Sequence, residues 1–408
     1  MNNLIDYFQR PKTHRSLYVL LLIATPFLLL QNYLQSAIGM LSELSFPIGE
    51  VEIPYVLAFA FLLVIVFLIA FRRSVTPKKL IGWVGVLFLF WVGQQSTDYY
   101  FNHKFYELQY NWHYFAYGIF ASLNYRVLKI KHYPPQKIIL HTFLYALAIS
   151  AFDELVQIPL SNRIFDIGDV AKDLWGTMIG LFILFVIIEN GQIFKNSTPF
   201  RQPHWKGYLE QPKSIFILAF LFAYIFMVVA SLLTDSDYLA QGIIIPIILF
   251  FIILMILHLS QNKKWRIFFI ALIILLVGIQ TASTIKYWNK NITYCKNNIL
   301  IYKGFILTYF DALIYPNGMF RAVDKKITFS PRDQQTIKSF SQDILIIGTG
   351  ESNRTGIGFP REEISQFIFN QKRDQGLQVI ILKNELACQK FNQLTEEGKR
   401  PTLILHHD

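Results

Sequence analysis

Long uninterrupted apolar runs fill the chain up to about residue 288. Each run is about 17 to 22 residues long, which is the length that a helix needs to cross the hydrocarbon core of a bilayer. From about residue 289 the apolar runs become short and alternate with polar residues, which predicts strands and helices of a soluble domain. The expected fold is a polytopic α-helical membrane protein of about nine spans followed by a small soluble α/β domain. The nine spans are predicted at residues 17–34, 54–71, 80–97, 111–128, 138–158, 170–188, 214–234, 239–260 and 265–283.

The predicted spans fall into two groups. Residues 1–190 form a six-span membrane region, and residues 214–288 form a three-span membrane region. Residues 191–213 between them are rich in Pro, Gly and Lys, which is typical of a linker. Residues 289–408 form the soluble α/β domain.

The composition and the distribution of charge support a membrane protein. Hydrophobic residues make up 53% of the chain and charged residues 16%, which excludes a soluble globular enzyme as the whole molecule. The net charge of +11 would indicate nucleic-acid binding in a soluble chain, but here it follows from alternate basic loops, which are typically cytoplasmic. We therefore expect the lipid bilayer as a partner, no nucleic acid, a cytoplasmic linker and an extracytoplasmic soluble domain. The basic loops contain Arg10, Lys12 and Arg15; Arg72, Arg73, Lys78 and Lys79; Arg126, Lys129, Lys131 and Lys137; Lys195, Arg201, Lys206 and Lys213; and Lys263, Lys264 and Arg266.

The soluble domain is predicted to alternate strands and helices. Short runs over 291–329 predict several strands, with a turn at 316–318. Further strands are predicted at 343–347, 376–383 and 401–407. Three helices are predicted: one that begins at Ser330, Pro331 and Asp333 and continues to about 340, one from Pro360 to Gln375, and one that Asn384 caps and Gly398 closes.

Two cysteines, Cys295 and Cys388, are too few for a disulfide framework. One pair does not by itself show whether the compartment is oxidising or reducing. Cys388 falls on a predicted helix, and we interpret it as a small core residue rather than as a nucleophile. No His pair has the spacing of a metal site with a third ligand, so the sequence predicts no metal and no cofactor.

The segment from 151 to 180 carries the most informative chemistry. Asp153, Glu154 and Gln157 end the fifth predicted span, and spacings of three and four residues place them on one helix face. Arg163 lies in the loop that follows, where a guanidinium can bind a carboxylate or a phosphate. Asp169 and Asp173 begin the sixth span, and Gly176 and Gly180 then allow a second helix to approach closely.

Two interpretations of these acids stay open. Ionisable groups at membrane depth usually face a protein interior or a cavity, which makes them candidates for ligand binding. The alternative is that the acids lie at the water interface, pair with Arg163 and only hold the hairpin together.

This segment resembles the signature of the VanZ-like family of bacterial membrane proteins, over about residues 80–190. The matching residues are Glu154, Gln157, Arg163, Asp169, Asp173, Gly176 and Gly180, together with His113 and Tyr117 at the start of an earlier helix. The chain departs from the pattern at Asp173, where the family usually has Asn, and before Arg163, where Ser-Asn replaces the common Pro-Gly. The resemblance implies a multi-pass protein of the bacterial inner membrane, and it makes His113 and Tyr117 additional candidates for ligand binding. The alternative for His113 is an interfacial belt residue among aromatic neighbours.

The tail resembles the small Mth-type domain of adipogenesis-associated proteins and of a mitochondrial complex I assembly factor. The departures are Phe391, where the family usually has Tyr, and Lys399, where it usually has Arg. The resemblance implies an interaction or assembly domain that docks a protein partner through 289–408. It also implies that the domain lies in a reducing or matrix compartment, whereas the basic loops predict an extracytoplasmic domain. The matching residues are DILIIGTG at 343–350, Pro360, Ala387, Cys388, Phe391, Asn392, Leu394, Glu397, Gly398 and Lys399.

These features favour a non-catalytic envelope protein that binds a lipid or another amphiphilic ligand. The resemblance to the VanZ-like family adds a glycopeptide-like ligand and antibiotic resistance, since that family is named after a protein linked to low-level teicoplanin resistance. One alternative is a membrane enzyme acting on a lipid-linked phosphate or ester, with Glu154 or Asp169 as general base and Arg163 stabilising anionic charge. Another is a proton-coupled transporter that uses Asp153, Glu154 and Asp173 as a relay.

Overall fold

The computed structural model is divided into a helical unit and a unit that holds the C-terminal sheets, and each is described here by itself. The helical unit contains residues 1–98, 102–231 and 242–252, and the second unit contains 99–101, 232–241 and 253–408. The structure describes residues 10–28, 40–41, 44–48, 51–70, 76–97, 108–159, 165–195, 204–325, 342–350, 363–370 and 375–407.

In the described part of the chain, a helix overlaps each of the nine predicted spans. Six of these helices are long and apolar enough to cross a membrane: α5, α7, α8 with its π-helical extension η1, α11, α12 and α13. This finding supports a membrane protein, whereas the count of nine spans stays a prediction. The helices are α2 (Pro11–Leu28), α4 (Tyr55–Ala70), α5 (Pro77–Thr97), α6 (Leu108–Ile130), α7 (Pro135–Gln157), α8 (Ile167–Phe182), η1 (Ile183–Ile188), α11 (Pro212–Leu232), α12 (Leu239–Leu259) and α13 (Lys263–Tyr287).

Short elements connect the long helices. Strands β1 (Ser45–Ile48) and β2 (Val51–Pro54) pair antiparallel before α4. The predicted linker 191–213 contains two short helices in its described part, α9 (Gln192–Lys195) and α10 (Trp205–Glu210), and the 3-10 turn η2 (Ser236–Tyr238) precedes α12.

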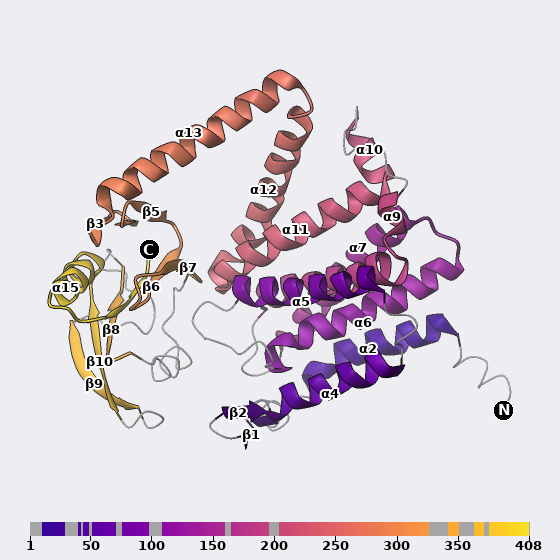
Figure 1. Ribbon diagram of the computed structural model, residues 1–408, viewed down its shortest axis with the longest axis horizontal. Helices are drawn as coiled ribbons and strands as arrows, with labels where there is room; N and C mark the ends of the chain where they lie inside the picture. The colour runs from indigo at the N-terminus through magenta and orange to yellow at the C-terminus, as the bar shows by residue number, and fades with distance from the viewer. Residues whose placement is uncertain are drawn as a thin grey trace. The chain divides into compact units, whose positions relative to one another are not determined.

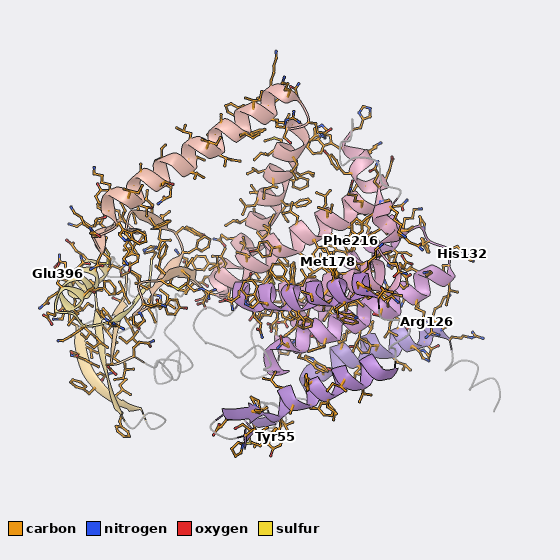
Figure 2. All side chains as sticks on the ribbon, in the orientation of Figure 1. Tyr55, Arg126, His132, Met178, Phe216 and Glu396 are labelled. Atoms are coloured by element: carbon orange, nitrogen blue, oxygen red, sulfur yellow. A yellow bond between two sulfur atoms is a disulfide. The ribbon has the colours of Figure 1, made fainter. Side chains whose placement is uncertain are left out.

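Helix α8 is the most buried of the six candidate spans. Its residues between Val170 and Leu181 are almost all buried, because α6 and α7 pack against it. Met178 of α8 and Phe216 of α11 lie among the packed side chains of the helical unit (Figure 2) and are both nearly inaccessible to solvent. Polar side chains on α8 are therefore held inside protein rather than in lipid, which is where ionisable groups in a membrane are tolerated.

The described part of the tail contains a six-stranded sheet with the order β7-β6-β11-β8-β10-β9. Strands β8, β10 and β9 are labelled in Figure 1. Strand β8 is parallel to both of its neighbours, and every other pair is antiparallel. The strands predicted at 343–347, 376–383 and 401–407 correspond to β8, β10 and β11. The bounds are β6 (Asp311–Ile314), β7 (Phe320–Val323), β8 (Ile344–Gly348), β9 (Ile364–Asn370), β10 (Gln375–Leu382) and β11 (Thr402–Leu405).

A three-stranded meander and one helix complete the core of the tail. Strands β3 (Ile292–Lys296), β4 (Ile299–Tyr302) and β5 (Phe305–Thr308) pair in sequence order, and α15 (Asn384–Glu396) packs against β3 and β8. Their side chains share one hydrophobic cluster that includes Leu300, Ile346, Phe391 and Leu403. The predicted turn at 316–318 is confirmed, since Gly318 adopts a positive φ and donates its N–H to the carbonyl of Tyr315 at 2.9 Å.

The two cysteines form a disulfide, Cys295–Cys388, that joins β3 to α15. Cys388 is 3% exposed and lies in the hydrophobic cluster of the tail. The prediction of a small core residue is therefore confirmed, and the pairing that the sequence left open is now assigned.

Two predictions for the tail are wrong. Residues 364–370, predicted as part of a helix from Pro360 to Gln375, form strand β9, because Ile and Phe are common there and favour strands, and the strand pairs antiparallel with β10. Lys383, not Asn384, occupies the N-cap of α15, because the Asn384 side chain bonds elsewhere. It accepts from the N–H of Gly350 at 3.0 Å and donates to the carbonyl of His406 at 2.7 Å.

The predicted helix from Asn384 to Gly398 is confirmed as α15, and another predicted tail helix lies outside the described residues. Gly398 ends α15 as predicted, with φ +78° and its N–H donated to the carbonyl of Thr395. The helix expected from Ser330, Pro331 and Asp333 to about 340 lies outside the described residues, as does Pro360.

Candidate functional site

Five polar side chains from three helices meet inside the helical unit. They are His113 of α6, Ser150 of α7, and Asp169, Lys172 and Asp173 of α8, and we refer to them as the His113 cluster. His113 Nδ1 lies 2.8 Å from Asp173 Oδ1, and Ser150 donates its hydroxyl to Asp173 Oδ2 at 2.6 Å. Both oxygens of the buried Asp173 carboxylate are therefore engaged, one by a residue of α6 and one by a residue of α7.

The cluster has a buried floor and an accessible rim. At the rim, Lys172 Nζ lies 2.7 Å from Asp169 Oδ1, and His113 Nε2 lies 3.7 Å from the same oxygen. The side chains of His113, Asp169 and Lys172 are 22–27% exposed, whereas that of Asp173 is 5% exposed. A ligand that reaches the rim would therefore meet an ammonium, an imidazole and one carboxylate at once.

Glu154 joins the end of α7 to the start of α8. Its Oε1 accepts from Gln157 Nε2 at 3.1 Å, and its Oε2 accepts from the backbone N–H of Asp166 at 3.0 Å. Asp166 in turn caps α8 by accepting from the N–H of Gly168 at 2.7 Å. Gln157 also lies 3.4 Å from Asp153 Oδ2. Glu154 thus holds the α7–α8 hairpin together, as the structural interpretation of the acids predicts. Its described partners are the side-chain amide of Gln157 and the backbone amide of Asp166.

Glu154 and the His113 cluster are neighbours in one electrostatic environment. Asp169 lies close enough to Glu154 for the two carboxylates to repel each other, and Asp166 interacts electrostatically with His113. Four carboxyl groups, those of Glu154, Asp166, Asp169 and Asp173, lie with one lysine and one histidine among these described residues. An excess of carboxylates favours a cationic group, such as an ammonium, on whatever binds there.

Two glycines of α8 make this arrangement possible. A Cβ on Gly176 would lie 2.7 Å from Tyr114 Cα and 2.8 Å from the carbonyl oxygen of His113, and a Cβ on Gly180 would lie 2.7 Å from the carbonyl oxygen of Gly118. These neighbours are backbone atoms of α6. The expected close helix approach at Gly176 and Gly180 is confirmed, and it brings His113 within hydrogen-bond distance of Asp173.

Tyr117 lies on α6 one turn after His113. Its hydroxyl is buried close to Ser150 and Asp173 but makes no hydrogen bond of standard geometry with any residue that the structure describes. The Tyr117 hydroxyl is therefore a further polar atom beside the floor of the cluster.

The structure brings most of the predicted site residues together. His113, Asp169 and Asp173 form direct contacts, Tyr117 lies beside them, and Asp153, Glu154 and Gln157 form an adjacent group. Arg163 lies outside the described residues, so its predicted role stays a prediction.

Sequence reasoning did not select Ser150, Lys172 or Asp166 as site residues. Ser150 precedes Glu154 by four residues, and Lys172 follows Asp169 by three, so helical spacing places each of them on the face of a residue that was selected. Asp173 was noted as a departure from the family's Asn. A carboxylate there accepts from both His113 and Ser150, whereas an amide would offer only one acceptor oxygen.

Among the described residues, no group of three His, Cys, Asp or Glu side chains is placed to hold a metal ion. The chain matches no protein-family model, and it has no significant similarity to the curated proteins or solved structures with which it was compared. The resemblances to the VanZ-like family and to the Mth-type domain therefore stay predictions.

Proposed function

We propose that the chain is a non-catalytic envelope membrane protein that binds the amine-bearing polar group of an amphiphilic ligand, a lipid or a glycopeptide-like molecule, at the His113 cluster. The observation that carries this proposal is the group of four carboxyl side chains around the partly exposed Lys172 and His113, at a place where α7 and α8 are long and apolar enough to span a membrane.

The residues at the rim suit a zwitterionic headgroup. Lys172 and His113 attract a phosphate or carboxylate, and Asp169 with the neighbouring Glu154 attracts an ammonium. An aminophospholipid carries both groups on one short headgroup, whereas its acyl chains remain in the bilayer. A primary ammonium donates hydrogen bonds to these carboxylates, which a trimethylammonium group cannot do.

The test is the thermal stability of the purified full chain in detergent with added lipid. Phosphatidylethanolamine should raise the melting temperature more than phosphatidylcholine or phosphatidylglycerol, because a ligand that binds only the folded state stabilises it. Asp169→Asn should remove this preference, since it deletes a rim carboxylate without changing its shape. Equal stabilisation by all three lipids, or an unchanged preference in Asp169→Asn, would contradict the proposal.

Glu189→Gln is a matched control for the loss of a carboxylate. Glu189 follows η1 and pairs with Lys129 of α6 at 2.6 Å. Lys129 is sixteen residues beyond His113, which is roughly 24 Å along a helix. Glu189→Gln should therefore change the melting temperature of the lipid-free protein and leave the lipid preference intact.

One observation favours a second candidate, a membrane enzyme acting on a lipid-linked phosphate or ester. Asp173 holds His113 through Nδ1, which leaves Nε2 directed to the accessible rim, as in a general base oriented by a carboxylate. This geometry suits His113 as the base better than Glu154, which the backbone of Asp166 occupies. Turnover of labelled membrane lipids that is lost in His113→Gln would replace the binding proposal with this one.

We also infer that the tail lies on the extracytoplasmic side of the bacterial inner membrane, where it docks a protein partner. The alternate basic loops support this side, and so does the Cys295–Cys388 disulfide, because disulfides persist mainly in oxidising compartments. A phosphatase that is active only outside, fused after residue 408, should be active. A fluorescent protein that folds only inside should stay dark at 408 and fluoresce after 192 and 262; fluorescence at 408 would contradict the inference.

A further inference from the structure

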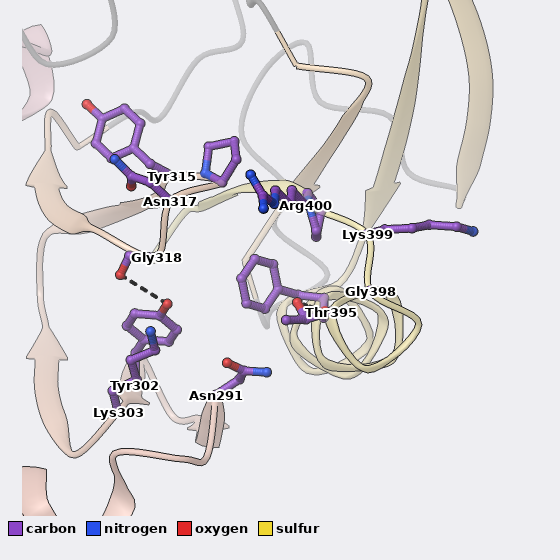
Figure 3. Close-up of a pocket in the computed structure, with 13 residues that line it drawn as sticks. Asn291, Tyr302, Lys303, Tyr315, Asn317, Gly318, Thr395, Gly398, Lys399 and Arg400 are labelled. Atoms are coloured by element: carbon purple, nitrogen blue, oxygen red, sulfur yellow. Dashed lines mark hydrogen bonds between the residues drawn. The ribbon is translucent and has the colours of Figure 1, made fainter.

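The tail contains a cavity of about 300 Å³ that three separate segments enclose (Figure 3). One segment belongs to the hairpin of β3 and β4. Asn291 directly precedes β3, and Tyr302 and Lys303 lie at the end of β4. The others are the β6–β7 turn at 315–318 and residues 391–401, which run from α15 toward β11. A volume of this size lies at the lower end of the range for small-molecule sites and suits a ligand with a single ring.

The cavity is cationic. Lys303, Lys399 and Arg400 line it, and none of its thirteen lining residues is acidic. Lys399 pairs with Glu397 at 3.0 Å and points away from the cavity in Figure 3. Lys303 and Arg400 form no ion pair with the described residues, so neither charge is compensated within that part of the chain. Arg400 lies on the side of Tyr315 and Asn317.

The walls of the cavity are flat, apolar and held in place. Tyr302 and Phe391 are 1% and 4% exposed, and their rings lie 6.3 Å apart between centroids. The Tyr302 hydroxyl donates to the carbonyl of Gly318 at 3.2 Å, which ties the β6–β7 turn to the meander. Asn317 accepts from the N–H of Met319 at 2.9 Å, so its own amide N–H groups stay available as donors. Because these two rings are almost inaccessible, they form a packed floor of the cavity, and the more accessible ring beside it is that of Tyr315.

Lys303 occupies a backbone position that does not suit lysine. It has φ +47° in the two-residue turn between β4 and β5, next to Gly304 at φ +80°. The preceding turn of the same meander places Asn297 and Asn298 at φ 52° and 55°, and asparagine is among the residues that tolerate this conformation best. The Lys303 ammonium lies over the Tyr302 ring, 5.3 Å from its centroid, at the cavity. The ammonium also lies 5.9 Å from the centroid of the Trp288 ring. What a lysine adds at this turn is therefore a positive charge held between two aromatic rings at the cavity.

We propose that this cavity binds a small anionic ligand in which a phosphate or carboxylate is attached to one ring, such as a sugar phosphate or a uronate. The anion contacts Lys303 and Arg400, the ring packs against Tyr315 above the floor that Tyr302 and Phe391 form, and Asn317 donates to ring hydroxyls. The site belongs to the tail alone and is independent of the His113 cluster.

The test is isothermal titration calorimetry of the purified full chain with four probes: glucose 6-phosphate, glucuronate, glucose and inorganic phosphate. Glucose 6-phosphate or glucuronate should bind at least about ten-fold more tightly than either glucose or inorganic phosphate, because the ring and the anion contribute together. Whichever of glucose 6-phosphate and glucuronate binds more tightly shows whether the site prefers a phosphate or a carboxylate. Inorganic phosphate that binds as tightly as both ring compounds, or the absence of binding by both at millimolar concentration, would overturn the proposal.

Variants separate loss of the site from loss of the fold. Lys303→Asn should weaken binding about ten-fold while preserving or raising the melting temperature, because Asn suits the left-handed turn. Arg400→Gln should weaken binding to a similar extent. Lys390→Gln, which removes a cation of α15 outside the cavity, and Asp169→Asn should both leave the affinity unchanged. Binding that survives both Lys303→Asn and Arg400→Gln would overturn the proposal.

Discussion

Gly176→Ala should destabilise the helical unit and separate the two halves of the His113 cluster. The added Cβ would lie 2.7 Å from Tyr114 Cα, and ordinary contact begins at 3.4 Å, so α6 and α8 must separate by 0.7 Å, the difference between the two. Both atoms that it would approach most closely are backbone atoms and cannot rotate away. A separation of that size would lengthen the 2.8 Å contact between His113 and Asp173 to about 3.5 Å, the limit of a hydrogen bond.

Gly118→Ala is the matched control on the same helix pair. Its Cβ would lie 3.7 Å from the carbonyl oxygen of Gly176 and 4.0 Å from Gly180 Cα, which is ordinary contact. Both substitutions gain about 1 kcal/mol of helix propensity, but only Gly176→Ala incurs the overpacking cost of about 1–3 kcal/mol. The free energy of unfolding should therefore be about 1–3 kcal/mol lower in Gly176→Ala than in Gly118→Ala.

The assay is unfolding of the detergent-solubilised chain by sodium dodecyl sulfate, followed by circular dichroism. Gly176→Ala should also lose the preference for phosphatidylethanolamine, whereas Gly118→Ala should keep it. Equal free energies of unfolding for the two variants would refute the close packing of α6 on α8 from which the site is derived.

Two predictions concern the tail. Cys295→Ala, or a reductant on the wild-type chain, should lower its stability by about 2–5 kcal/mol, because the disulfide closes a loop across a sequence separation of 93 residues; a melting temperature unaffected by reductant would contradict this. Burial lowers the pKa of His407 below its ordinary value of about 6.5. As the pH falls, the unfolded chain therefore binds a proton at His407 before the folded chain does. The contribution of neutral His407 to the free energy of unfolding is complete above about pH 6.5. Below that pH it decreases by at most about 1.4 kcal/mol per pH unit. Thermal melts between pH 7.5 and 5 should show a smaller decline in His407→Gln than in the wild type, and equal declines would show that His407 does not titrate as described.

The long helices and the close helix pair could be predicted from sequence because each depends on a local pattern. Apolar runs of spanning length marked the positions of nine helices, and the four-residue spacing of Gly176 and Gly180 indicated where another helix approaches. The same pattern did not predict that α6 is the helix that packs on α8, nor the rotation of α6 about its own axis. The pairing of His113 with Asp173 depends on that rotation, as does the contact of Ser150 with the same carboxylate.

The errors in the tail have a common physical cause, which is that tertiary partners decided the local structure. Residues 364–370 became a strand because the edge of β10 offered an antiparallel partner. Asn384 has a good side chain for a helix cap, yet its amide instead joins Gly350 to His406 across the sheet edge. The Cys295–Cys388 pair likewise depends on the packing of α15 against β3, which no spacing along the chain reveals.

The most direct test of the His113 cluster as a headgroup site is photocrosslinking with a phosphatidylethanolamine that carries a diazirine on its headgroup. After irradiation in reconstituted membranes, mass spectrometry of the peptides would locate the adducts. We predict adducts concentrated on α6 and α8 near His113 and Lys172 and strongly reduced in Asp169→Asn. Adducts that are spread over the exposed helix α13, with no enrichment at α6 and α8 and no change in Asp169→Asn, would contradict the account.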